Sequence, residues 1–131
     1  MTQAKHLVAV VDDDASVRKA LSRLLISAGF LVESYSGGAQ FLETLAQHIP
    51  NCAILDLHMP TMSGLELQGR IIDSGCHVPV IIITAHDEAT LHERALRGGA
   101  LGYLAKPFVD KVLLEAVERA VSGMEDGANS G

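Results

Sequence analysis

The sequence is short of cysteine, of positive charge and of long apolar runs. Cys52 and Cys76 are the only cysteines, and their spacing lacks the paired pattern of zinc ligands, which predicts two reduced core thiols. Ten basic residues stand against 16 acidic ones, and this net charge of −6 argues against direct nucleic-acid binding, which needs clustered Lys and Arg. No run approaches the roughly 18–20 apolar residues of a membrane helix. We therefore expect a cytoplasmic protein that contacts neither a membrane nor nucleic acid through this segment.

Apolar residues, in contrast, are abundant. The hydrophobic fraction of 48% and the mean hydropathy of +0.25 are ample for a packed interior, and 131 residues fit one domain better than two. We expect that domain to span residues 1–121. Residues 122–131 are rich in Gly and Ser, which predicts a flexible tail or a truncated linker.

Five short runs rich in Val, Ile and Leu predict β-strands that are buried on both faces. They cover residues 7–11, 31–35, 52–55, 80–83 and 101–104. The segments between and after them repeat apolar residues at helical spacing, from the first stripe at 17–28 to the last at 109–120, which begins with Val109 and Val112. Five strand–helix units in this order predict an α/β fold, with a parallel sheet covered by helices on both faces.

Helix boundaries carry their own signals. Ser63 and Glu66 have the spacing of a capping box, which predicts a helix start. Asp14 lies between the first strand and the first helical stripe, so an N-cap is favoured there over a metal ligand.

Polar residues stand directly after the predicted strands. Asp12 and Asp13 follow the first strand, Asp56 the third, Thr84 the fourth and Lys106 the fifth. Because ligands of open α/β sheets bind beyond the carboxyl ends of the strands, we expect these five side chains to form one site.

The chemistry of that site follows from its charges. Two carboxylates about 5 Å apart repel by roughly 3 kcal/mol at an effective dielectric near 20, so several acids facing one Lys need a further cation. Mg²⁺ prefers carboxylate oxygens and keeps positions open for phosphate oxygens. A carboxylate can attack a phosphoryl group, with a metal, a lysine and a hydroxyl stabilising the transferred charge. The site therefore predicts phosphoryl transfer to an aspartate beside Mg²⁺.

Five motifs in this order and spacing resemble the receiver domain of a two-component response regulator over residues 5–121. The matching stretches are 10–14 (VVDDD), 55–60 (LDLHMP), 63–67 (SGLEL), 83–85 (ITA) and 99–108 (GALGYLAKPF). The resemblance implies a flavodoxin-like (βα)5 fold, doubly wound, with a five-stranded parallel sheet in the order 2-1-3-4-5.

The resemblance also implies a role for each acidic residue of the site. Asp56 matches the phosphoacceptor, Asp13 a direct Mg²⁺ ligand, and Asp12 a ligand acting largely through water. Asp56 also contacts the metal, and His58 matches the position whose backbone carbonyl binds it. His58 and His86 match positions whose side chains tune the rate of dephosphorylation.

The remaining matches concern catalysis and switching. Lys106 matches the lysine that pairs with the carboxylate and then with the phosphoryl group, and its bond to Pro107 is usually cis in the family. Thr84 and Tyr103 match the switch pair, in which the hydroxyl moves to the phosphate and the aromatic ring turns inward.

The resemblance implies a signalling switch that a sensor histidine kinase phosphorylates. The switch face would be the fourth helix, fifth strand and fifth helix, at about residues 87–121, which also supports a homodimer in the family. The output would be transcription regulation, through a DNA-binding domain outside this segment. The only reactions expected are self-catalysed phosphoryl transfer and autodephosphorylation, so the chain is not expected to be a classified enzyme.

Three alternatives differ in function. A haloacid-dehalogenase-type phosphatase would carry phosphate on Asp12 instead of Asp56, but the acidic pair of its last motif is missing. A flavin-binding electron carrier shares the architecture, but three aspartates after the first strand would repel its phosphate. A receiver-like interaction module would never take phosphate, which the joint presence of the site residues argues against. Surface positions without a metal are expected for four histidines, His6, His48, His86 and His92.

Overall fold

Strands and helices alternate along residues 5–130, the part of the chain that this computed structural model describes, with side chains described through Gly123. The strands are Leu7–Val11 (β1), Leu31–Tyr35 (β2), Cys52–Asp56 (β3), Val80–Thr84 (β4) and Gly102–Ala105 (β5). The helices are Ala15–Ser27 (α1), Gly38–Leu45 (α2), Gly64–Asp73 (α3), Ala89–Arg97 (α4) and Asp110–Ser130 (α5). All strand pairs are parallel and the sheet order is β2-β1-β3-β4-β5, which confirms the predicted fold class and strand order.

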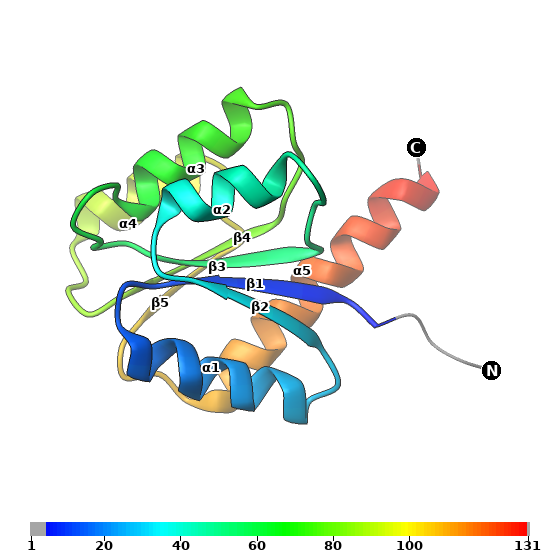
Figure 1. Ribbon diagram of the computed structural model, residues 1–131, viewed down its shortest axis with the longest axis horizontal. Helices are drawn as coiled ribbons and strands as arrows, with labels where there is room; N and C mark the ends of the chain where they lie inside the picture. Colours follow the sequence, from blue (N-terminus) through cyan, green and yellow to red (C-terminus); the bar gives the residue numbers. More distant parts are fainter. Residues whose placement is uncertain (1–4, 131) are drawn as a thin grey trace.

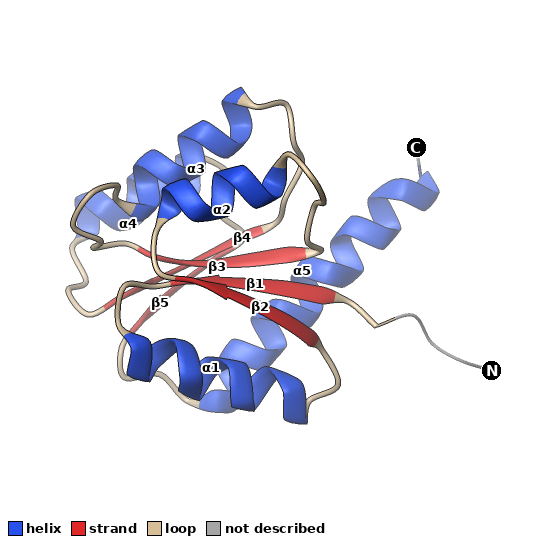
Figure 2. Ribbon diagram, in the orientation of Figure 1, coloured by secondary structure: helices blue, strands red, loops and turns tan. Residues whose placement is uncertain are grey.

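The sheet is the middle of three layers (Figure 1). Helices α2, α3 and α4 cover one face, and α1 and α5 cover the other, as the colouring by secondary structure also shows (Figure 2). Successive residues of a strand point to opposite faces of the sheet. In β3, Ala53 and Leu55 belong to the core under α2–α4, whereas Cys52 and Ile54 belong to the core under α1 and α5. Each layer of helices thus has its own apolar core, and the two cores share the central strands.

The prediction of strands buried on both faces holds for the centre of the sheet and is wrong at its edges. Every residue of β3 and β4 is buried, but β2 and β5 are largely half-buried or exposed because each has only one neighbouring strand. The last apolar stripe also begins too early. Val109 is 66% exposed and Val112 is 41% exposed, so burial of α5 starts at Leu113.

Local capping explains where the helices begin. The Asp14 carboxylate accepts hydrogen bonds from the backbone N–H groups of Ser16 and Val17, which confirms Asp14 as the N-cap of α1. The Ser63 hydroxyl accepts a hydrogen bond from the backbone N–H of Glu66, which is one of the two hydrogen bonds of the predicted capping box and confirms Ser63 as the N-cap of α3. Both caps lie in loops that leave the carboxyl ends of strands, so they also fix the loops of the candidate site.

Helix α5 is longer than the apolar pattern indicates. Its backbone is helical through Ser130, where the composition predicts a flexible tail or linker from residue 122. The use of this segment as a linker stays a prediction. Within the described residues, no helix is both long and apolar enough to cross a membrane.

Candidate functional site

The parallel register brings the carboxyl ends of four strands to one edge of the sheet. Val11 pairs with Leu55, and Asp56 pairs with Ile83, so the residues after β1 lie beside the end of β3. Thr84 pairs with Ala105 at the ends of β4 and β5. Asp56 and Thr84 are the last residues of their strands, so each strand is one residue longer than its apolar run predicts. Strand backbone hydrogen bonds therefore hold both residues in position.

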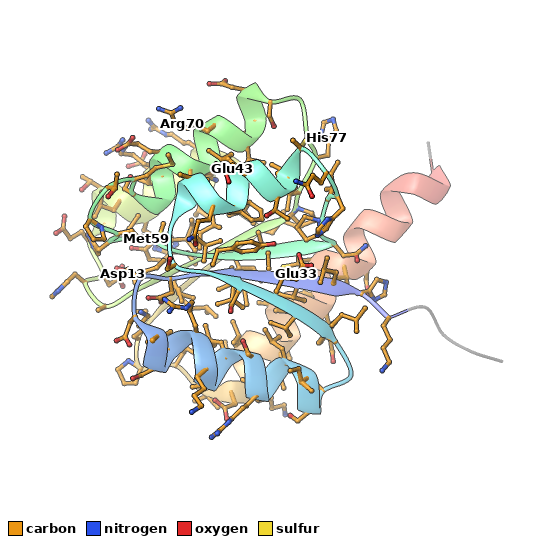
Figure 3. The ribbon with its side chains drawn as sticks, in the orientation of Figure 1. Asp13, Glu33, Glu43, Met59, Arg70 and His77 are labelled. Carbon is orange, nitrogen blue, oxygen red and sulfur yellow. The ribbon has the colours of Figure 1, made fainter. Side chains whose placement is uncertain are left out.

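Three carboxylates meet at this edge, as the sequence predicts. One oxygen each from Asp12, Asp13 and Asp56 lies within 4.8 Å of the other two. Asp12 and Asp56 are buried, whereas Asp13 is exposed to solvent. Figure 3 shows Asp13 near Met59 at this end of the sheet, and the two residues line a cavity of about 300 Å³ together with the loop that precedes α2. The acidic cluster is thus reachable from solvent on the side of Asp13.

The ammonium group of Lys106 is the cation that lies next to the carboxylates of Asp12 and Asp56. Its Nζ lies 3.2 Å from Oδ2 of Asp12 and 3.8 Å from Oδ1 of Asp56. The backbone N–H of Lys106 donates to the carbonyl of Thr84, and the bond between Lys106 and Pro107 is cis, as predicted. The other oxygen of Asp12 accepts from the backbone N–H of Asp14 at 2.9 Å. Both oxygens of Asp12 therefore have protein partners.

The pKa of Asp56 is shifted by its burial and by the neighbouring charges. Burial, and after it the negative charge of Asp12, raises the pKa of the Asp56 carboxyl from 3.8 to about 6, although Lys106 acts in the opposite direction. One lysine therefore does not compensate the carboxylates of the site. The surplus negative charge is what a divalent cation with oxygen ligands would neutralise, and a set of carboxylates fits Mg²⁺ or Ca²⁺ better than softer metals.

A glycine that the motif contains, but whose role the sequence does not reveal, holds the loop after β3. A Cβ atom at Gly64 would lie 2.6 Å from the carbonyl oxygen of Asp56 and 3.0 Å from Cα of Leu57. The N–H of Gly64 donates to the carbonyl of Leu57. The start of α3 is therefore packed directly against the backbone of Asp56, which only a residue without a side chain allows.

The side chain of Thr84 is fully buried, and its hydroxyl is bonded within its own loop. Its Oγ1 donates to the carbonyl of His86 at 3.0 Å and accepts from the N–H of His86 at 3.0 Å. The His86 ring lies on the surface and meets the His58 ring edge to face, with 5.6 Å between ring centroids. Residues of the loops after β3 and β4 thus face each other beside the acidic cluster.

Tyr103 contributes its ring to the core under α2–α4. Its hydroxyl oxygen is buried and has no hydrogen-bond partner among the described residues. Burial, and after it the charge of Asp87, raises the pKa of the Tyr103 hydroxyl. The ring is stacked on His92 of α4, with centroids 4.2 Å apart and planes 6° from parallel.

His48, like His86, lies at the surface as expected, whereas His6 and His92 are half-buried. His48 and His92 each have a specific partner. His92 is half-buried in its stack with Tyr103, and Nε2 of His48 lies 2.7 Å from Oε1 of Glu33. Neither contact follows from sequence spacing, because each joins residues from separate elements that only the fold brings together.

Comparisons with known proteins agree with this geometry. A protein-family model described as the response regulator receiver domain matches residues 8–118. Nodulation protein W of Bradyrhizobium diazoefficiens is 37% identical over 116 residues, which are 88% of this chain and 51% of that protein. The DNA-binding transcriptional regulator NtrC of Escherichia coli is 40% identical over 122 residues, 93% of this chain and 26% of that protein.

A solved structure gives the same result for the fold. The crystal structure of FixJ-N superposes with a TM-score of 0.86 at 35% identity, covering 92% of this chain and 96% of FixJ-N. This chain spans about half the length of nodulation protein W and less of NtrC. The family match covers most of the 131 residues, and its limits enclose all the residues of the acidic site. The chain therefore belongs to the response regulator receiver domain family of two-component signalling proteins.

Proposed function

We propose that this domain accepts a phosphoryl group on Asp56 from a sensor histidine kinase and acts as a phosphorylation-dependent switch. The observation that carries the proposal is the meeting of three carboxylate oxygens within 4.8 Å, with the Lys106 ammonium 3.8 Å from Asp56. Asp56 is the acceptor of choice, because one of its oxygens has Lys106 nearby and its carboxyl group borders the exposed Asp13.

Mg²⁺ is the proposed cofactor. Asp13 and Asp56 would bind it directly, Asp12 largely through water, and the backbone carbonyl of His58 would complete the protein ligands. The engagement of both Asp12 oxygens by protein groups supports its indirect role. When bound, the metal would neutralise carboxylate charge and stabilise the charge of the transferred phosphoryl group.

In the reaction, a carboxylate oxygen of Asp56 attacks the phosphorus of phosphohistidine. The new P–O bond forms as the P–N bond breaks, and the leaving imidazole nitrogen keeps the electron pair and takes up a proton. Lys106 binds a phosphoryl oxygen in place of its looser contact with Asp56. The same groups then stabilise attack by water on the phosphorus, which breaks the P–O bond to Asp56, releases inorganic phosphate and returns the aspartate. The rings of His58 and His86 control how water reaches the phosphorus.

The switch follows from the new oxygens on Asp56. The Thr84 hydroxyl would leave the carbonyl of His86 and donate to a phosphoryl oxygen, because a charged acceptor makes the stronger hydrogen bond. The Tyr103 ring would then turn inward, toward the space that the Thr84 hydroxyl leaves. These movements would change the shape of the face formed by α4, β5 and α5, which a partner would recognise.

That face also carries apolar residues suited to a partner. Leu96 of α4 is 51% exposed and Val112 of α5 is 41% exposed. We propose that phosphorylation favours a homodimer through this face in the cytoplasm, and that the domain binds no nucleic acid itself. Its output would be a DNA-binding transcription domain, as the name of the relative NtrC indicates for that protein. Sedimentation with and without beryllofluoride tests the dimer, and a monomer under both conditions would contradict it.

Phosphorylation with a small-molecule phosphodonor and Mg²⁺ tests the acceptor assignment. Intact-protein mass spectrometry should detect one phosphoryl group on the wild type and on Asp73→Asn, an exposed matched control, but none on Asp56→Asn. Asp12→Asn distinguishes the proposed function from the rival phosphatase mechanism. If Asp12→Asn is not labelled and Asp56→Asn is fully labelled, the phosphate is on Asp12. Equal labelling of wild type and Asp56→Asn would refute the proposal.

A further inference from the structure

The contact between His92 and Tyr103 joins α4 to β5, two of the three elements of the proposed switch face. His92 lies on α4, one turn after the helix starts at Ala89, and Tyr103 lies on β5. The ring centroids are 4.2 Å apart and the planes differ by 6°, so the two rings overlap face to face. The half-buried state of His92 shows that this ring is enclosed by the protein and does not extend freely into solvent.

No hydrogen bond of ordinary geometry holds the hydroxyl of Tyr103 in its place, although Asp87 and the backbone of Glu88 lie near it. The hydroxyl oxygen is buried without a hydrogen-bond partner among the described residues, which disfavours this position of the side chain relative to one that reaches water. The ring must therefore be held by its own contacts, with the core under α2–α4 on one side and with His92 in the stack.

The beginning of α4 is a weakly anchored element. Its N-cap residue, Glu88, makes no side-chain capping hydrogen bond, in contrast to the capped starts of α1 and α3. The backbone N–H of His92 donates to the carbonyl of Glu88, so the histidine moves with this first turn. A contact between His92 and Tyr103 thus connects the position of the ring to the position of the first turn of α4.

We propose that His92 is a positioning residue that stacks on Tyr103 and stabilises the inward ring before any phosphoryl group is present. The inference rests on the proposed role of Tyr103 in the switch and adds a residue to it. Because binding and ring position are linked reciprocally, a residue that favours the inward ring also favours the ligand that needs it. Loss of the stack therefore weakens ligand binding without touching the acidic site.

Tyrosine fluorescence measures the ring directly. The chain has no Trp and two Tyr residues, so Tyr103 is the only remaining fluorophore of this type in a Tyr35→Phe background. In that background, His92→Ala should make Tyr103 more accessible to acrylamide, with the inward population falling about two- to tenfold relative to the outward one. His92→Phe retains an aromatic ring and should preserve protection. His77→Ala, an exposed histidine at the other end of the sheet (Figure 3), should have no effect.

Calorimetric titration with beryllofluoride in Mg²⁺ links the ring to the site. His92→Ala should bind the phosphoryl mimic about two- to tenfold more weakly than the wild type, and His92→Phe should restore binding. His92→Gln removes the ring but keeps a polar side chain, and it replaces His92→Ala if that variant does not fold. A wild type that binds no beryllofluoride refutes the proposed function. If the wild type binds beryllofluoride, and His92→Ala or His92→Gln matches it in both acrylamide quenching and affinity, only the proposed role of His92 is overturned.

Discussion

Nζ of Lys106 lies 3.2 Å from Oδ2 of Asp12, although 94 residues separate them along the chain. The Asp12 side chain is fully buried, and the lysine side chain is 23% exposed. The pair joins the loop after β1 to the loop after β5 across the carboxyl edge of the sheet. The ion pair neutralises the charge of the buried Asp12 carboxylate, whereas the Asp56 carboxylate lies farther from the same ammonium group.

Removal of the Lys106 charge should destabilise the protein when no metal is present. Lys106→Met leaves Asp12 and Asp56 without their cation, and the free energy of unfolding should fall by about 1–2 kcal/mol at neutral pH, since solvent partly screens this lysine. Urea unfolding measures the loss, with Lys111→Met, at an exposed position of α5, as the control. Added Mg²⁺ should restore more stability to Lys106→Met than it adds to the wild type. Equal unfolding of the two lysine variants would contradict this.

The raised pKa of Asp56 makes stability depend on pH in metal-free buffer. The fold favours the protonated carboxyl, so its contribution is fully present below about pH 4 and is lost as the pH rises through about 6. A shift of about two units corresponds to roughly 2–3 kcal/mol. Asp56→Asn has no such loss, so its advantage over the wild type should grow between about pH 4 and pH 7. Urea unfolding across this range measures the difference, and Asp73→Asn should follow the wild type. A pH-independent advantage would contradict the expectation.

Two glycines of α3 should respond in opposite directions to the same substitution. Gly64→Ala places a methyl group 2.6 Å from the Asp56 carbonyl oxygen, so the backbone must shift at a cost of about 1–3 kcal/mol. Gly69→Ala meets nothing within 4 Å and should stabilise the helix by about 0.5–1 kcal/mol. Thermal unfolding compares the two, and Gly64→Ala should also slow phosphorylation because it displaces Asp56. Similar melting temperatures for both variants would show that the loop is not packed as described.

The two thiols should differ in reactivity. Burial raises the pKa of Cys52 to about 12, whereas Cys76 is half-buried in the loop between α3 and β4. A thiolate-specific reagent at mildly alkaline pH should label one cysteine in the folded protein and both after unfolding. Cys76→Ala should remove the fast labelling, and fast labelling that persists in this variant would show that Cys52 is reachable in the folded state.

Local patterns in the sequence determined the element order and most of the site. The alternation of apolar runs with helical stripes predicts five strand–helix units, because side-chain burial repeats every two residues in a strand and about every 3.6 in a helix. The polar residues after the strands predict the acidic edge, since parallel strands end at the same side. Asp14 and Ser63 likewise identify their helix starts through short-range hydrogen bonds.

The tertiary structure decided everything that depends on distance between segments. Strands β2 and β5 are partly exposed because they lie at the edges of the sheet. The apolar run of a single strand does not show whether that strand lies at an edge. The close approach of Gly64 to Asp56 and the stack of His92 on Tyr103 each need backbones placed to within a few tenths of an ångström. The raised pKa of Asp56 arises in the same way, because burial and the Asp12 charge act on it only after separate strands have brought the carboxylates together. Sequence alone thus determined which residues gather at the acidic edge, and packing decided their charge, their contacts and the surroundings of Tyr103.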